Sequence, residues 1–270
     1  MKAKTIILLL SASFFLSFNL RNSKNDKKII MAIFAHADDE IPVAPLLSKY
    51  AKDGYTVYWV IASKGEKGIR QHAGIPEGDS LAAVRMNEAI CVSKALGIVS
   101  PIFLGMNDGT LDEDFTGEPL HKKIDSVLKQ YKPNIIITWG PDGGYGHVDH
   151  RMIHNVVSEI FQSGLLSQLQ ELYYSGVPTE HWQNIPSYKT DIVKFFHQGW
   201  RPVKKEYLTT RIKCDSKYIE NARQAVYCYN SQFTKEEMED LKLWMQNMNK
   251  DTVYLRPFTA PRKITYKLTE

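Results

Sequence analysis

The chain has 270 residues, a formal net charge of +4 at pH 7 and 43% hydrophobic residues. This length fits one large domain or two small ones, and the hydrophobic fraction is ordinary for a globular protein. Positive and negative residues are mixed along the chain, so the charge is too weak to predict a nucleic-acid partner. The sequence contains neither an internal repeat nor a low-complexity segment.

The N-terminus has the three-part pattern of a secretory signal peptide. Lys2 and Lys4 precede an apolar run over residues 5–18, and a polar stretch over residues 19–28 follows. The apolar run is shorter than the roughly 20 residues of a membrane-spanning helix. We therefore predict a signal peptide over residues 1–22, a single domain over residues 23–270, and export to the periplasm, the cell surface or the medium. An uncleaved anchor is the alternative.

Apolar runs alternate with amphipathic segments along the first two thirds of the chain. Runs that are apolar throughout, rather than at every second residue, are typical of buried parallel strands. Strands are predicted at residues 29–35, 55–62, 98–104, 134–139 and 171–175. Helices are predicted between them at residues 41–51, 80–96, 122–131 and 149–161. This alternation predicts an α/β fold with a mostly parallel sheet.

The last third of the chain is less regular. Residues 177–203 are rich in aromatic side chains, which usually pack in a core but would stack on a sugar if they were exposed beside a cleft. A strand is predicted at residues 207–212, followed by helices at residues 216–230 and 234–249. Thr234 and Glu237 have the spacing of a capping box. No segment has the composition of a linker, which supports a single domain.

Two polar clusters follow predicted buried strands. The first is His36-Ala37-Asp38-Asp39-Glu40, and the second is His147-Val148-Asp149-His150. In open α/β sheets, functional groups lie beyond the carboxyl ends of the strands, so the two clusters are expected to meet there. Histidine nitrogen and aspartate oxygen both suit zinc, which in catalytic sites keeps three protein ligands and one position for water. The sequence therefore predicts one metal ion between the clusters.

The clusters also contain candidates for proton transfer. Asp38 lies next to a candidate ligand without having to bind the metal, so it is the candidate general base for the water. A protonated His147 would stabilise negative charge on the carbonyl oxygen and later protonate the leaving amine. Asp149 would hold the His147 ring and raise its pKa. The alternative for either cluster alone is a helix start, where the helix dipole stabilises acidic side chains.

Two other groups have structural explanations on spacing alone. Arg85 and Glu88 are three residues apart on one helix face, which favours a solvated ion pair. The spacing of Cys91, Cys214 and Cys228 does not resemble a zinc knuckle. An oxidising compartment would permit a Cys214–Cys228 disulfide, and three unpaired thiols are the alternative.

Residues 35–40, Ala-His-Ala-Asp-Asp-Glu, resemble the A-H-P-D-D-E signature of the PIG-L/LmbE-like family, the zinc-dependent N-acetylglucosaminyl deacetylases. Residues 147–150 match its H-x-D-H element, and Tyr145-Gly146 matches the residues before that element in some members. The similarity extends over about residues 28–175. Weaker matches are Arg85-x-x-Glu88, Ala95-Leu96-Gly97, Leu104 with Asp108-Gly109, and a fainter one at Asn230-Ser231-Gln232.

This resemblance implies a Rossmann-like three-layer α/β sandwich and a zinc cofactor, with iron(II) fitting the same ligands. The implied metal ligands are His36, Asp39 and His150. The implied catalytic residues are Asp38 as general base, His147 as acid or oxyanion stabiliser, Asp149 tuning His147, and Tyr145 on the developing oxyanion. The implied sugar contacts are Arg85 and Asp108. Ala37 replaces the usual proline, and Tyr229 stands where many members carry a histidine, which argues against a substrate role there.

The function predicted is a zinc-dependent hydrolase that removes the N-acetyl group from an N-acetylglucosamine-type amino sugar or glycoside. Its partner is a small-molecule or glycan substrate, with no nucleic acid and no membrane span after processing. Export favours glycans or glycosides outside the cell. The alternatives are a metal-dependent phosphoesterase and a non-catalytic secreted glycan-binding protein. The complete ligand set with Asp38 argues against the second alternative, because binding alone needs no base.

Overall fold

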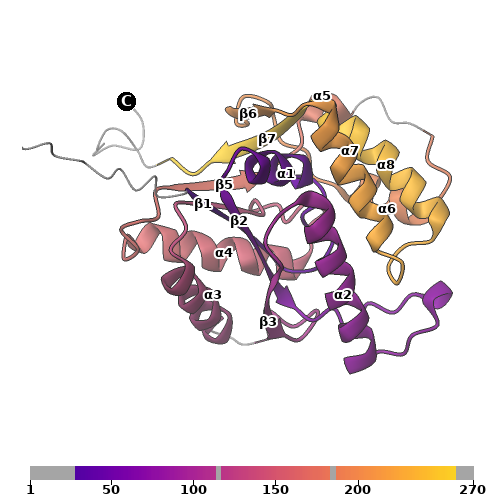
Figure 1. Ribbon diagram of the computed structural model, residues 1–270, viewed down its shortest axis with the longest axis horizontal. Helices are drawn as coiled ribbons and strands as arrows, with labels where there is room; N and C mark the ends of the chain where they lie inside the picture. Colours follow the sequence, from indigo (N-terminus) through magenta and orange to yellow (C-terminus); the bar gives the residue numbers. More distant parts are fainter. Residues whose placement is uncertain (1–27, 114–116, 183–186, 260–270) are drawn as a thin grey trace, which may run out of the picture.

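The computed structural model describes residues 28–113, 117–182 and 187–259. The predicted signal peptide at residues 1–22 lies outside the described residues. Within them, seven strands form one sheet in the order β3-β2-β1-β4-β5-β7-β6 (Figure 1). The strands are β1 (Ile29–Phe34), β2 (Thr56–Ser63), β3 (Ile102–Met106), β4 (Ile135–Thr138), β5 (Glu171–Ser175), β6 (Thr210–Lys213) and β7 (Thr252–Pro257).

The first five strands are parallel, and β7 runs antiparallel to both β5 and β6. The helices are α1 (Ala44–Lys52), α2 (Asp79–Leu96), α3 (Glu118–Tyr131), α4 (Val148–Ser163), α5 (Thr179–Trp182), α6 (Asp191–Gly199), α7 (Ser216–Ala225) and α8 (Lys235–Asn249). Two 3₁₀ turns are η1 (Gln71–Ala73) and η2 (Val226–Cys228). The predicted α/β fold with a mostly parallel sheet is confirmed.

Helices cover both faces of the sheet, because alternate side chains of the central strand β1 enter different cores. Ile30, Ala32 and Phe34 pack in the core under α1, α2, α7 and α8. Met31 and Ile33 pack in the other core, under α3 and α4. Both faces of β1 are therefore apolar, which explains its continuously apolar sequence. Among the residues described here, no helix is both long and apolar enough to cross a membrane.

The sheet reverses its strand order between β1 and β4. From β1 the chain builds outward through β2 and β3, and it then returns to place β4 on the other side of β1. The two strands pair in parallel, with Ile30 opposite Ile135 and Ala32 opposite Ile137. In open α/β sheets, ligands bind at such a switch point beyond the carboxyl ends of the strands. Both polar clusters begin there.

Several element boundaries differ from the predictions. Strand β3 begins at Ile102 rather than residue 98, because Pro101 has no backbone N–H for the sheet. The segment 177–203, predicted to be irregular, contains α5 and α6. The predicted helix 216–230 ends as α7 at residue 225 and continues as η2. Strand β7 was not predicted, although its alternate residues Val253 and Leu255 are buried, as expected for an antiparallel strand.

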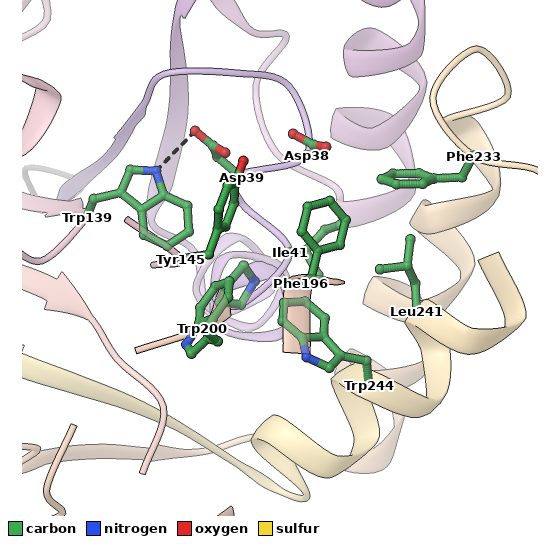
Figure 2. Close-up of a pocket in the computed structure, with 11 residues that line it drawn as sticks. Asp38, Asp39, Ile41, Trp139, Tyr145, Phe196, Trp200, Phe233, Leu241 and Trp244 are labelled. Carbon is green, nitrogen blue, oxygen red and sulfur yellow. Dashed lines mark hydrogen bonds between the residues drawn. The ribbon is translucent and has the colours of Figure 1, made fainter. Parts of the chain in front are cut away.

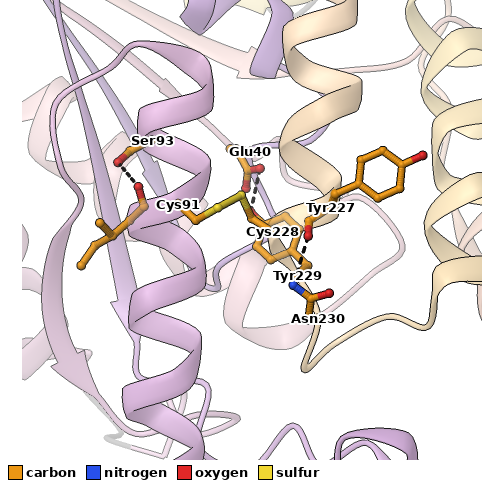
Figure 3. Close-up of a disulfide and its surroundings, with 8 residues drawn as sticks. Glu40, Cys91, Ser93, Tyr227, Cys228, Tyr229 and Asn230 are labelled. Carbon is orange, nitrogen blue, oxygen red and sulfur yellow. Dashed lines mark hydrogen bonds between the residues drawn. A yellow bond between two sulfur atoms is a disulfide. The ribbon is translucent and has the colours of Figure 1, made fainter.

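The disulfide joins Cys91 of α2 to Cys228 of η2, whose Cα atoms are 5.8 Å apart (Figure 3). Cys214 is buried and free. The predicted Cys214–Cys228 bond is therefore wrong, as is the alternative of three unpaired thiols. The ten-residue helix α7 separates Cys214 from Cys228 and is about 15 Å long, whereas bonded cysteines need Cα atoms within roughly 7 Å.

Candidate active site

Asp39 lies just beyond β1, and three N–H groups hold its carboxylate. Its Oδ2 accepts hydrogen bonds from the backbone of Ala35 (3.0 Å) and His36 (2.9 Å) and from the indole Nε1 of Trp139 (3.0 Å). These bonds leave Oδ1 facing Nε2 of His150 at 3.1 Å. One carboxylate oxygen therefore fixes the side chain, and the other remains available as a ligand.

His150 is held in a similar way at the start of α4. Its Nδ1–H donates to the carbonyl of Gly143 (3.0 Å), and its ring stacks on Trp139 with the ring centroids 4.5 Å apart. Gly143 has φ +63°, and a Cβ there would lie 2.9 Å from the Arg151 side chain and 3.0 Å from the His147 carbonyl. Glycine is therefore needed to bring this carbonyl to His150. The lone pair of His150 Nε2 points into the site.

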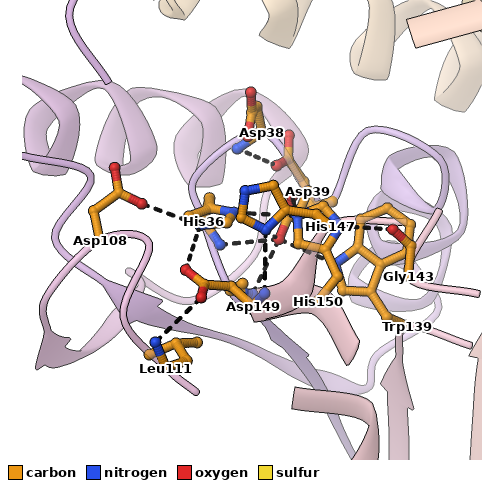
Figure 4. Close-up of polar contacts among 12 residues, drawn as sticks. His36, Asp38, Asp39, Asp108, Leu111, Trp139, Gly143, His147, Asp149 and His150 are labelled. Atoms are coloured by element: carbon orange, nitrogen blue, oxygen red, sulfur yellow. Dashed lines mark hydrogen bonds and ion pairs between the residues drawn. The ribbon is translucent and has the colours of Figure 1, made fainter. Parts of the chain in front are cut away.

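His36 completes the group of ligands (Figure 4). Its Nε2 lies 3.1 Å from Oδ2 of Asp149 and 3.2 Å from Oδ1 of Asp108, so this nitrogen carries the hydrogen. Its Nδ1 then faces Nε2 of His150 at 3.1 Å. Burial opposes the charged form of His36, but the nearby carboxylates outweigh burial and raise its pKa well above the usual value. Two facing lone pairs at this distance require a cation between them, which is either a proton or a metal ion.

The donor atoms fit a metal ion of the predicted kind. Two imidazole nitrogens and one carboxylate oxygen are a common set for zinc, and iron(II) accepts the same set. The predicted ligands His36, Asp39 and His150 are therefore brought together. Ligand atoms of His36, His147 and His150 also lie within 4.8 Å of one another, so His147 is within reach of the same ion.

Asp38 faces the site from a backbone conformation that non-glycine residues rarely adopt. Its φ is +97°, and such a conformation costs of the order of 1–3 kcal/mol unless the surroundings fix it. The Asp38 N–H donates to Oε2 of Glu40 (3.1 Å), and Oε1 of Glu40 accepts from the hydroxyl of Tyr229 (2.7 Å). Burial raises the pKa of Asp38 well above its usual value and that of Glu40 to about 7. Tyr229 is fully buried behind Glu40, so it supports the site from outside the substrate space.

His147 and Asp149 differ from the predicted arrangement. The carboxylate of Asp149 contacts His36 and the backbone N–H groups of Gly109 (2.9 Å) and Leu111 (3.1 Å), and it does not hold the His147 ring. Only the backbone N–H of Asp149 reaches His147, donating to Nδ1 at 3.2 Å. Burial lowers the pKa of His147, and the neighbouring histidines lower it further. The expected rise in this pKa is therefore wrong, and the neutral ring carries its hydrogen on Nε2.

A polar chamber of about 240 Å³ opens from the site, and Arg85 and Asp108 both line it. Arg85 donates from Nη2 to the carbonyl of Gly68 (2.8 Å). A Cβ on Gly68 would lie 2.4 Å from that Nη2, so glycine lets this loop close on the guanidinium. The predicted solvated Arg85–Glu88 ion pair is wrong, because both side chains are buried and Glu88 instead accepts from Oγ of Ser231 (2.8 Å).

A second, apolar chamber adjoins the first, and no sequence pattern indicated it (Figure 2). Its walls include Trp139, Phe196, Trp200, Phe233 and Trp244. Two of these lie in the segment 177–203, whose aromatic side chains were expected to pack in a core or, if exposed beside a cleft, to stack on a sugar. The others have the spacing of ordinary core residues, so no local pattern distinguished them.

Comparisons with known proteins agree with this geometry. Residues 31–161 match the family model described as PIG-L: GlcNAc-PI de-N-acetylase. A 1D-myo-inositol 2-acetamido-2-deoxy-alpha-D-glucopyranoside deacetylase of Mycobacteroides abscessus is 26% identical over 170 residues, covering 56% of this chain and 61% of the relative. The chain spans about half to three fifths of the length of the curated relatives it matches.

Two solved structures share the fold. The N,N'-diacetylchitobiose deacetylase from Pyrococcus horikoshii has a TM-score of 0.64 at 17% identity, covering 89% of this chain and 87% of its own. GalB, the 4-carboxy-2-hydroxymuconate hydratase from Pseudomonas putida KT2440, has a TM-score of 0.61 at 15% identity, covering 90% and 100%. Because a deacetylase and a hydratase share this architecture, the fold alone does not decide the reaction. The motifs at residues 35–40 and 147–150 and the match over residues 31–161 confirm the predicted resemblance to the PIG-L/LmbE-like family.

Proposed function

We propose that this protein is a metal-dependent amide hydrolase that removes the N-acetyl group from an N-acetylglucosamine-type amino sugar or glycoside. The observation that carries the proposal is the convergence of His36 Nδ1, Asp39 Oδ1 and His150 Nε2 beside the carboxylate of Asp38. The deacetylase names of the curated relatives support it. Zinc is the proposed metal, with iron(II) as the alternative that the same ligands accept.

A divalent ion held by these ligands would lower the pKa of its water to roughly 7 and polarise the amide carbonyl. The role proposed for Asp38 is to accept the proton of that water. Burial raises the pKa of Asp38, and a more basic carboxylate is a stronger proton acceptor. The hydrogen bond from the Asp38 backbone to Glu40 keeps the carboxylate in place.

Tyr145 and His147 are the proposed hydrogen-bond donors to the carbonyl oxygen. Burial, with the neighbouring carboxylates, raises the pKa of Tyr145, so its hydroxyl keeps its proton at neutral pH. The backbone contact at Nδ1 leaves the hydrogen of His147 on Nε2. Two neutral donors stabilise the negative charge that develops on oxygen without having to change protonation first. The proton that Asp38 accepts from the water would then pass to the nitrogen of the leaving amine as the C–N bond breaks, so the neutral His147 ring keeps its own hydrogen.

The polar chamber is the proposed site for the sugar. It has hydrogen-bonding groups on several sides, including Arg85, Asp108 and Gln232. The hydrogen bond from Arg85 Nη2 to the carbonyl of Gly68 holds the guanidinium at the wall of this chamber. Sugar hydroxyls are both donors and acceptors, which suits a chamber with a guanidinium and a carboxylate.

We also propose that the protein is exported. The Cys91–Cys228 disulfide supports export, since disulfides persist mainly in oxidising compartments. Cell fractionation followed by immunodetection tests this. Protein found in the cytoplasmic fraction with free Cys91 and Cys228 thiols would contradict it.

Acetate release from a panel of N-acetylhexosamine glycosides tests the function. We expect metal-loaded wild-type protein to release acetate, and Asp38→Asn to reduce kcat about a hundredfold or more, the usual contribution of a general base. Asp112→Asn is the matched control, because Asp112 is exposed in the loop after β3. Metal content is measured for each protein, so that loss of the base is separated from loss of the ion.

Other outcomes would favour the other hypotheses. Equal acetate release by the wild-type and Asp38→Asn proteins would reject the role of Asp38. Phosphate release from phosphate esters without acetate release would favour a phosphoesterase. Sugar binding without either product would favour a glycan-binding protein.

A further inference from the structure

We propose that the site also hydrolyses amides whose acyl group is longer than acetyl, and that this acyl chain lies in the apolar chamber beside the metal ligands. This inference rests on the proposed amide hydrolysis and extends it to the acyl side of the substrate. The chamber begins at the carboxylates of Asp38 and Asp39 and runs away from them between aromatic rings (Figure 2). The residues that line it are Asp38, Asp39, Ile41, Pro42, Trp139, Tyr145, Phe196, Trp200, Phe233, Leu241 and Trp244.

The chamber has more room than a methyl group needs. Its volume is about 40 Å³, whereas roughly 10–15 Å³ measured in this way holds one water molecule. Three or so groups of that size fit in it, which corresponds to a short acyl chain. Apart from the carboxylates at one end, its walls are formed mainly by aliphatic side chains and aromatic rings. Such a wall favours an alkyl chain over a sugar.

The two chambers meet at the position of the reaction. Both are lined by Asp38, Tyr145, Phe196 and Phe233. An amide at this junction has two substituents that point apart, namely the amine carrying the sugar and the acyl group. The polar chamber contains Arg85 and the other hydrogen-bonding groups, so it suits the sugar. The apolar chamber is left for the acyl group.

The chamber walls come from three separate parts of the chain. Trp139 follows β4, Trp200 follows α6, and Trp244 belongs to α8. The Trp200 and Trp244 rings lie 5.0 Å apart between centroids, and the Trp139 and Trp200 rings 5.8 Å apart. Rings held against one another in this way form a rigid wall, which discriminates between acyl lengths better than a flexible one. The alternative explanation is a packing gap in the core beside an enzyme that removes only acetyl groups.

A series of N-acyl substrates separates these explanations. The N-acetyl, N-propionyl, N-butyryl and N-hexanoyl amides of one glucosamine glycoside are compared by release of the free amine. We expect kcat/KM to rise about fourfold for each methylene that is buried, and to stop rising once the chamber is full. A kcat/KM that is highest for acetyl and falls with each added methylene overturns the inference but leaves the proposed function intact. No amine from any substrate would instead reject the proposed function.

Filling the chamber tests its location. Leu241 is 1% exposed and lines the chamber, whereas Leu243 on the same helix is 42% exposed. We expect Leu241→Phe to lower the ratio of butyryl to acetyl kcat/KM at least about tenfold, as the loss of two buried methylenes predicts. Leu243→Phe is the control and should leave this ratio unchanged. A folded Leu241→Phe protein with the wild-type ratio would overturn the inference.

A binding measurement avoids both catalysis and mutation. Three of the five tryptophans line the chamber, so a ligand that enters it should change the intrinsic fluorescence. We expect a saturable change when wild-type protein is titrated with butyramide, and a weaker response to acetamide at the same concentrations. These uncharged amides do not require the metal, so the metal-free protein is used as well. Equal responses to the two amides would count against an acyl site.

Discussion

The proposed metal ligands and the end of the apolar chamber away from them come from different regions of the molecule. His36 and Asp39 follow β1 and His150 lies in the first turn of α4, all inside the region that matches the family model. Five of the eleven residues that line the chamber instead lie beyond residue 190, on or near α6 and α8: Phe196, Trp200, Phe233, Leu241 and Trp244. Under the proposed function, the parallel sheet would position the reaction, whereas the later segments would select the acyl group that reaches it.

Three contacts join the two regions behind the site. They are the Cys91–Cys228 disulfide, the hydrogen bonds from Ser231 to Glu88, and the hydrogen bond from Tyr229 to Glu40. All three involve residues 228–231, which lie between α7 and Phe233 of the chamber wall. A substitution of a metal ligand is therefore expected to abolish the reaction. A substitution within residues 228–231 is expected to alter the stability of the fold and the preference among acyl groups.

The largest effect is expected for a metal ligand. His150→Ala should lose the metal and with it several kcal/mol of transition-state stabilisation, which is about a thousandfold or more in kcat/KM for every substrate. Metal analysis and steady-state kinetics measure the two losses. His121→Ala on α3 is the control, since His121 is a partly exposed histidine outside the two metal-binding groups. Unchanged metal content in His150→Ala would contradict the proposed ligand set.

The difference between the regions also explains what could be predicted from the sequence. The candidate ligands within each cluster are only a few residues apart, and each cluster follows a strand that is apolar throughout. The sequence therefore predicted that both clusters lie at the same edge of the sheet. The partner of Cys228 depends instead on the packing of η2 against α2, which no short pattern records. Leu241 and Trp244 have the spacing of any buried helix face, so only the three-dimensional structure shows that they border a chamber.

Removing the disulfide is expected to have the next largest effect. The bonded cysteines are 137 residues apart, and a native disulfide typically contributes about 2–4 kcal/mol to stability. The double variant Cys91→Ala/Cys228→Ala should lower the free energy of unfolding by that amount in urea titrations. It should also change the preference among acyl groups more than it changes metal affinity, because residues 228–231 lead into the chamber wall.

Reduction and the third cysteine provide the controls for the disulfide. A thiol reductant should lower the stability of the wild-type protein towards that of the double variant, and leave the variant itself unchanged. Cys214→Ala keeps the disulfide and should remain sensitive to the reductant. The contrary result is a wild-type stability that stays the same after the reductant has freed both thiols. It would show that the connection between residues 228–231 and α2 does not depend on this disulfide.

The smallest effect is expected at Tyr229. Tyr229→Phe removes only the hydroxyl that donates to Glu40, and an unsatisfied buried acceptor costs about 1–3 kcal/mol. Because Glu40 also accepts from the Asp38 backbone, kcat should fall about tenfold, which corresponds to the lower end of this range. The KM should change less, since Tyr229 lies outside both chambers. Tyr227→Phe, in the 3₁₀ turn η2 just before Tyr229, removes a hydroxyl that contacts Lys242 and Glu239 and serves as the control.

The pH dependence of stability distinguishes this role of Tyr229 from general loss of packing. Burial raises the pKa of Glu40 to about 7, and the Tyr229 hydroxyl opposes that rise, so Tyr229→Phe should raise the pKa further. The pKa of Glu40 is higher in the folded state than in the unfolded state. Its contribution to the free energy of unfolding is therefore fully present below the pKa of the unfolded state and is lost as the pH rises through the pKa of the folded state. The stability difference between metal-free wild-type and Tyr229→Phe proteins should therefore grow as the pH rises above about 7. A difference independent of pH would mean that the hydroxyl does not act through the ionised carboxylate of Glu40.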